Sequence, residues 1–221
     1  MNKPLLIATL LLFVTGRPAW AKEEKKILPP KQIVTDGKVF KYNPAWKDKE
    51  TYLEVNCDDD AEQEIVISFL GTYKPPSEES RLDKNETFLP PGQELIILEN
   101  YAFYQIYDKD AGGHYQLLKT IHAMDQLGEV KVLRLENTKT IALAFLSPGG
   151  ENYTDLSIYQ WQEGGYRLLL NDGGSLGIEL DLAGHPATIR ILRKQGADVF
   201  VWDPEKKSFV LSGYRTPKDS Y

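Results

Sequence analysis

The feature that most constrains the fold is an alternation of apolar and polar residues that recurs three times, each time around a turn. The paired stretches are 64–73 with 104–118, 140–149 with 157–170, and 188–196 with 199–212. A period of two residues, rich in Val, Ile, Leu, Tyr and Phe and bounded by Gly, Pro, Asn and Asp, is typical of half-buried β-strands. The chain is therefore predicted to be all-β.

One aromatic residue recurs just before each turn and another just after it. Those before the turn are Tyr107, Trp161 and Trp202, and those after it are Tyr115, Tyr166 and Phe209. Because the tryptophans recur at equivalent places, they are predicted to pack in the core rather than to stack on a ligand. An extended piece precedes each unit, so residues 50–213 are expected to form about three four-stranded antiparallel repeat units. Typical closed propellers have at least four blades, so these units would be propeller-like or an open β array.

The N-terminus has the pattern of a secretory signal peptide. Lys3 is followed by an apolar stretch from Leu5 to Val14, and Ala19-Trp20-Ala21 precedes a charged run. This pattern predicts a signal peptide in residues 1–21, cleaved after Ala21. The apolar stretch of about ten residues is roughly half of what a membrane span needs. We therefore expect a periplasmic or extracellular protein with no transmembrane segment after cleavage.

The charge is uneven along the chain. Loss of Lys3 and Arg17 would leave 24 basic and 32 acidic residues, a formal charge of −8, which argues against a nucleic-acid partner. Residues 22–49 nevertheless hold eight lysines and four acids, and form a basic N-terminal arm. This arm is either a solvated leader or a segment that docks on an anionic envelope surface. Its stretch KVFKYNPAW (38–46) could also supply an extra edge strand.

Cys57 is the only cysteine, so this chain can form no internal disulfide. Its acidic neighbours disfavour a thiolate, and we expect a buried structural thiol. The histidines His114, His122 and His185 are isolated and have no metal-binding spacing. No serine-nucleophile motif is present either. These observations predict a protein that is not an enzyme.

Residues 74–92 form an insertion within the first unit. Proline pairs lie at both of its ends and charged residues in its middle. Such a long segment between strands is expected to be an exposed loop, and exposed loops often carry binding functions. Residues 214–221 follow the last unit as a C-terminal tail.

The acidic turn LEVNCDDDAEQE (53–64) is the strongest candidate for a cation site. Asn56, Asp58, Asp60 and Glu64 occupy places one, three, five and nine of a loop, and Glu62 at place seven can offer its carbonyl. Ca²⁺ takes six to eight oxygen ligands, and alternating acids in a tight turn can point inward together. The sequence leaves two interpretations open: a Ca²⁺ loop, or a solvated turn in which Asp58 or Asp60 accepts backbone hydrogen bonds.

This pattern resembles the FG-GAP-like, or VCBS-type, repeat family, whose units carry a DxDxDGxxE turn, an apolar strand and a hairpin. The matching parts are 56–64, 65–67 and 106–118. The resemblance implies propeller blades and an acidic turn that binds Ca²⁺ in extracellular or periplasmic settings. Ala61 replaces the usual glycine, where a left-handed conformation would cost about 1 to 2 kcal/mol. Residues 136–139 and 181–186 have lost most of the acids in the other two units, so only the first turn should bind a cation.

Together these features predict an exported, non-enzymatic binding module whose partner is a protein or a cell-envelope component. It would use the insertion and the loop edges, with one structural Ca²⁺ and no other cofactor. The alternative is a secreted glycan hydrolase that uses loop carboxylates, and a third hypothesis is a structural component of an envelope assembly. A hydrolase should have a deep pocket and a carboxylate of raised pKa, whereas a module should have a shallow surface.

Overall fold

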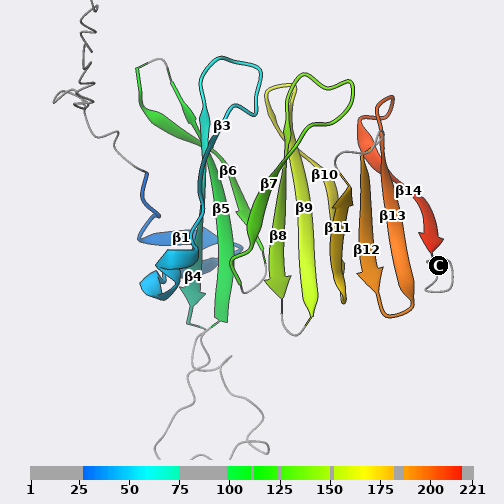
Figure 1. Ribbon diagram of the computed structural model, residues 1–221. Helices are drawn as coiled ribbons and strands as arrows, with labels where there is room; N and C mark the ends of the chain where they lie inside the picture. Colours follow the sequence, from blue (N-terminus) through cyan, green and yellow to red (C-terminus); the bar gives the residue numbers. More distant parts are fainter. Residues whose placement is uncertain are drawn as a thin grey trace, which may run out of the picture.

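The computed structural model describes residues 27–74, 99–110, 112–123, 126–149, 152–181 and 187–215. In these ranges the protein is all-β, with three antiparallel sheets that lie side by side in chain order (Figure 1). This confirms the predicted fold class, and the arrangement is that of an open β array. The predicted signal peptide, the predicted insertion beyond Lys74 and the predicted tail beyond Arg215 lie outside the described residues, whereas residues 214 and 215 of that tail belong to the last strand. In the part of the chain that is described, no helix has the length and apolarity of a membrane span.

The first sheet has six strands in the order β1-β2-β4-β5-β6, and β3 pairs with the remaining part of β4. β2 pairs with residues 71–73 and β3 with residues 64–67, so both lie along the same edge of β4. A short 3-10 helix, η1 (Pro44–Lys49), connects them. The strands are β1 (Gln32–Thr35), β2 (Lys38–Tyr42), β3 (Tyr52–Val55), β4 (Glu64–Tyr73), β5 (Glu99–Lys109) and β6 (Tyr115–His122).

The basic arm thus contributes to the fold. β1 and β2 form a hairpin around Asp36 and Gly37, which have φ values of 51° and 73°. Two consecutive left-handed residues are typical of the tight turn that matches the twist of a hairpin. Residues 38–42 of the predicted stretch 38–46 supply the extra strand, β2, which pairs with β4, whereas residues 44–49 form η1.

The second and third sheets are four-stranded meanders, as predicted for a repeat unit. Glu163 and Gly164 form the hairpin turn of the second sheet with φ values of 51° and 82°. The second sheet contains β7 (Glu129–Leu133), β8 (Ala142–Gly149), β9 (Tyr153–Gln162) and β10 (Gly165–Gly174). The third contains β11 (Gly177–Asp181), β12 (Thr188–Arg193), β13 (Gly196–Asp203) and β14 (Ser208–Arg215).

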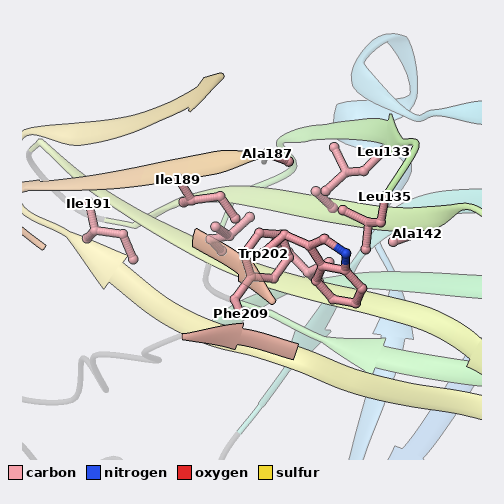
Figure 2. Close-up of a cluster of buried hydrophobic side chains, with 11 residues drawn as sticks. Leu133, Leu135, Ala142, Ala187, Ile189, Ile191, Trp202 and Phe209 are labelled. Atoms are coloured by element: carbon pink, nitrogen blue, oxygen red, sulfur yellow. The ribbon is translucent and has the colours of Figure 1, made fainter. Parts of the chain in front are cut away.

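The core consists of two seams between neighbouring sheets and of a third cluster, around Phe40 and Phe69, within the first sheet. The first seam, between the first and second sheets, buries residues that include Val66, Tyr104, Leu143 and Phe145. The second seam, between the second and third sheets, buries the residues of Figure 2, where Trp202 and Phe209 lie among leucine, isoleucine and alanine side chains. Burying one large apolar side chain contributes about 1.5 to 3 kcal/mol.

Each recurrent aromatic pair lies on the face of its sheet that is turned toward the preceding part of the chain. Tyr107 and Tyr115 pack on the cluster around Phe40 of the N-terminal hairpin, and Tyr166 packs into the first seam. Trp202, which is 1% exposed, fills the second seam as predicted. The prediction was wrong for Trp161, which is only partly buried because it lies at the end of the first seam beside a hollow.

Candidate metal centre

Three carboxylates meet at the upper end of the first sheet in Figure 1, where the loop 56–63 joins β3 to β4. Asp58 and Asp60 come from this loop and Asp108 from the end of β5. One oxygen from each carboxylate lies within 4.8 Å of the others. Carboxylates this close repel one another unless a cation or a proton intervenes. This acidic triad could in principle hold a metal ion.

The local sequence explains the shape of the loop. Asp58 Oδ1 accepts a hydrogen bond from the backbone N–H of Asp60 at 2.9 Å, and Asp60 Oδ1 accepts one from Glu62 at 2.9 Å. Such Asx turns are the usual way in which aspartates shape a turn. Asn56 Nδ2 closes the loop by donating to the carbonyls of Asp60 at 2.8 Å and Glu62 at 3.0 Å. Ala61 has no positive φ, so the strain expected for an alanine at this place does not arise.

Two carboxylate oxygens beside the triad are buried without a hydrogen-bond partner in the described structure: Glu64 Oε1 and Asp108 Oδ1. Ile65 pairs with Tyr107, so the same register makes Glu64 and Asp108 neighbours across the two strands. The other oxygen of Glu64 accepts a short hydrogen bond from the Cys57 backbone N–H. A buried polar atom without a partner costs about 1 to 3 kcal/mol, and a cation or a water molecule would remove this cost.

Burial governs the protonation of these acids. Asp58 is only 7% exposed, and its burial raises the pKa of its carboxyl. The backbone N–H of Asp60 opposes this shift, whereas the charges of Asp60 and Asp108 add to the rise of the Asp58 pKa. Burial likewise raises the pKa of Glu64, which is fully buried. Without a cation, burial thus shifts Asp58 and Glu64 toward their protonated forms, whereas a bound cation would favour their ionised forms.

Cys57 is a buried free thiol, as predicted. Its Sγ lies 2.8 Å from the hydroxyl of Tyr166 on β10, so this contact crosses the first seam. Burial raises the pKa of both the Cys57 thiol and the Tyr166 phenol well above their ordinary values. A thiol in this state is a poor nucleophile, and Cys57 acts as a link between the two sheets.

The triad differs in membership from the ligand set expected from sequence. Of the expected ligands, Asp58 and Asp60 lie in the triad. Asn56 hydrogen-bonds within the loop, the Glu62 carbonyl accepts one of these bonds, and Glu64 bonds to Cys57. The expected five-residue set stays a prediction. Sequence reasoning missed Asp108, whose only signal was its place directly after the alternating run 104–107.

The loop of the metal centre also borders a hollow of about 550 Å³. Asp59, which lies between the two triad aspartates of the loop, accepts a hydrogen bond at 2.8 Å from the indole N–H of Trp161. The Trp161 ring lies edge-to-face with Tyr166, with 5.2 Å between centroids. The hollow is lined further by parts of the second and third sheets, including Lys139, Arg167 and Lys207. The metal centre and the hollow therefore share one loop.

A second hollow, of about 290 Å³, lies in the first seam near the start of β5, away from the triad. Its lining includes His122, Ser147 and Asp155. Burial raises the pKa of Asp155, with the charge of Asp172 adding to the rise, and burial lowers the pKa of His122. Asp155 is the only carboxylate among the described residues that line this hollow.

No protein-family model matches the chain, and neither the curated proteins nor the solved structures that were compared include a match.

Proposed function

We propose that this protein is an exported, non-enzymatic binding module, stiffened by one Ca²⁺, that binds a protein or cell-envelope component. The binding surface would be its loop end, defined as the end that carries residues 56–63, 134–141, 163–164 and 204–207. The observation that supports this most is the acidic triad, in which Asp108 has a buried oxygen without a partner. The loop that supplies Asp58 and Asp60 also holds Trp161 at the hollow through Asp59. An ion at the triad would fix this loop and, through Asp59, the position of Trp161.

The donor set favours a hard cation. Every group of the triad is a carboxylate, and the nearby Cys57 Sγ faces Tyr166 instead. Transition metals prefer nitrogen or sulfur ligands, whereas Ca²⁺ accepts irregular sets of oxygens. Mg²⁺ demands a stricter octahedral geometry. An exported protein also meets the millimolar Ca²⁺ at which weak extracellular sites are filled.

The arrangement of the acids supports binding over hydrolysis. A glycosidase needs two carboxyl groups that face each other across the substrate. In the larger hollow, Asp59 bonds to Trp161 and Glu163 forms an ion pair with Arg167. Among the described residues that line the second hollow, Asp155 is the only one with a carboxylate. The neighbouring Asp172 forms an ion pair with Arg193 at 2.8 Å. Neither of these two hollows presents a free pair of acids among its described residues. A third hollow, of about 360 Å³, has Glu54, Glu62 and Asp110 in its lining, so this support for binding extends only to the first two.

Thermal unfolding tests the cation. We expect the midpoint of the wild type to rise when EDTA is replaced by millimolar Ca²⁺, because a ligand at about 100 times its Kd adds about 2.7 kcal/mol. Asp108→Asn should lose this response, yet be more stable than the wild type in EDTA, because it removes one of three repelling charges. Glu179→Gln makes the same kind of change at an exposed acid of the third sheet and should keep the response. An unchanged midpoint in the wild type would refute the Ca²⁺ site.

A further inference from the structure

We propose that the hollow at the loop end binds an acidic saccharide, a short oligosaccharide that contains uronic acid residues. Trp161 would stack on a sugar ring, and Lys139 and Lys207 would pair with the carboxylates of the ligand. This inference rests on the proposed function, because it takes the loop end as the binding surface and names the chemistry of its ligand.

The size and position of the hollow suit a small ligand. Its volume of about 550 Å³ falls within the roughly 300 to 1,000 Å³ of typical ligand sites. All three sheets contribute to its wall, so a ligand there would touch the whole array. The lining comes from Asp59, residues 137–140, 160–163, 167–169 and 206–208.

Trp161 is a fixed but accessible aromatic platform. At each seam, a recurrent tryptophan donates a hydrogen bond from its indole N–H to a loop of the preceding repeat unit. In both cases this loop joins the first two strands of that unit. Trp161 donates to Asp59 Oδ1 at 2.8 Å, and Trp202 donates to the carbonyl of Glu136 at 3.0 Å. Trp202 is 1% exposed, whereas Trp161 is only partly buried and lines the hollow. A ring that is already held in place loses little entropy when a flat apolar sugar face stacks on it.

The charge of the hollow opposes the charge of the protein. Four basic side chains, Lys139, Arg167, Lys206 and Lys207, line it together with two acids, Asp59 and Glu163. The chain as a whole has a formal net charge of −6. A positive concavity on a negative protein concentrates anions locally.

Two of the four cations are available to a ligand. Arg167 pairs with Glu163, and Lys206 lies 3.2 Å from Asp203. Lys139 and Lys207 form no ion pair with any residue in the described ranges. Their ammonium groups can therefore bind the carboxylates of an incoming ligand without first losing a partner.

The remaining polar groups match the hydroxyl groups of a sugar. The side chains of Asn137, Gln162 and Ser208 line the hollow beside the indole ring. Gln162 uses its amide nitrogen to donate to Gln160 at 2.8 Å, so its oxygen can accept a hydrogen bond from a ligand. A uronic acid residue has an apolar ring face for the indole of Trp161, a carboxylate for the two lysines and hydroxyl groups for these polar side chains.

Isothermal titration calorimetry of the whole protein with trigalacturonate tests the proposal. Neutral maltotriose and the peptide triglutamate serve as competitors of the same length. We expect trigalacturonate to bind, binding to weaken as salt is added because exposed charges are screened, and the two competitors to bind at least about tenfold more weakly. Equal binding of maltotriose, or tighter binding of triglutamate, would overturn the acidic-saccharide assignment.

Matched variants locate the site. Trp161→Ala should weaken trigalacturonate binding about tenfold or more, as is usual for a central aromatic contact. The double change Lys139→Gln with Lys207→Gln should weaken it roughly three- to tenfold. Lys194→Gln alters an exposed lysine in the β12–β13 turn, at the other end of the third sheet, and should leave binding unchanged. Near-ultraviolet circular dichroism shows whether each variant is folded, and unchanged affinity in the folded double variant would contradict the proposal.

The titration is repeated in EDTA and in Ca²⁺ to separate this inference from the cation site. If Ca²⁺ raises the thermal midpoint but trigalacturonate binds in neither buffer, the acidic-saccharide inference fails while the cation site stands. If trigalacturonate binds equally in both buffers and the midpoint does not move, the saccharide inference stands without the cation. Tighter binding in Ca²⁺ supports both, because Asp59 links the triad to Trp161.

Discussion

The two seams are built from the same strand order but are filled by different chemistry. The second seam is apolar: Trp202 and Phe209 lie edge-to-face, 5.4 Å apart, among aliphatic side chains (Figure 2). The first seam carries at its loop end the Cys57–Tyr166 contact, the buried Glu64 and the acidic triad. The two seams thus differ in that one is closed by apolar packing and the other holds buried acids.

The loops at the ends of the two seams differ in whether their polar groups all have hydrogen-bond partners. In residues 134–141, Thr138 Oγ1 lies 2.8 Å from the carbonyl of Leu135 and 2.9 Å from that of Thr140, so this loop closes on itself. In residues 56–63, two aspartates also shape the turn, but Asp58 is buried beside Asp108, which has an unpartnered oxygen. Buried polar groups lower stability unless they are fully satisfied. The unpartnered oxygens of Glu64 and Asp108 thus lower the stability of the first seam unless a cation, a proton or a water molecule satisfies them.

Replacing the two recurrent tryptophans with alanine should give the largest difference in stability between the two seams. Trp202→Ala should destabilise the protein by about 3 to 5 kcal/mol, because it leaves a cavity in the second seam. Trp161→Ala should cost clearly less, because its ring is partly exposed. Equilibrium unfolding in urea measures both, and equal losses would show that the seams do not differ as described.

Changing pH in EDTA should act on the two buried acids of the first seam, Asp58 and Glu64. Burial raises the pKa of Asp58 and Glu64 above their unfolded values, so the native state binds more protons than the unfolded state. Their contribution to stability is therefore present below the unfolded pKa and is lost as pH rises through the folded pKa. We expect Asp58 and Glu64 to add stability between neutral pH and about pH 4.5, near the ordinary value for Glu, whereas His122, whose pKa is lowered, works in the opposite direction.

The matched variant for this pH series is the double change Asp58→Asn with Glu64→Gln. It should lose the stability that these two acids add as the pH falls. In Ca²⁺ the slope should reverse, because the ion requires the ionised carboxylates. A pH dependence in EDTA that is the same in the wild type and in this double variant would contradict the protonation assigned to Asp58 and Glu64.

Loss of the Cys57–Tyr166 link should have a smaller effect. Tyr166→Phe removes the hydroxyl 2.8 Å from Cys57 Sγ and should cost about 0.5 to 1.5 kcal/mol, as for an ordinary buried hydrogen bond. Urea unfolding measures this loss. Because the thiol is buried, Cys57 of the native wild type should also resist modification by a soluble disulfide reagent until the protein unfolds. Rapid modification of the native protein would show that the first seam opens.

The smallest effect is expected far from both seams. Glu179 and Arg190 form an exposed ion pair across β11 and β12, at 3.3 Å. Exposed pairs contribute roughly 0 to 1 kcal/mol, so Glu179→Gln should change the free energy of unfolding only slightly. A large decrease in the free energy of unfolding, measured in urea, would mean that β11 and β12 contribute to stability through this exposed pair as well as through the second seam.

The strands could be predicted from sequence because a period of two residues is a local property that survives any tertiary arrangement. This holds for 157–170 around its Gly164 turn and for the extra strand at residues 38–42. The buried thiol of Cys57 could be predicted too, because its acidic neighbours oppose a thiolate.

The site could be predicted only in part. Asp108 joins Asp58 and Asp60 because β4 and β5 pair in one particular register, and a register between distant segments cannot be read from either one. Trp161 and Trp202 occupy equivalent places in sequence, yet their exposure depends on the neighbouring sheets. The acidic loop was recognisable as such, whereas its contact with Trp161 was not.

The most direct test of the account is equilibrium dialysis of the wild type and of Asp108→Asn against radioactive Ca²⁺. Asp108→Asn removes one carboxylate from the triad and leaves both Asx turns of the loop intact. We expect one Ca²⁺ per wild-type chain at millimolar concentration and none, or far weaker binding, in the variant. Equal binding by the two proteins, or no binding by the wild type, would contradict it.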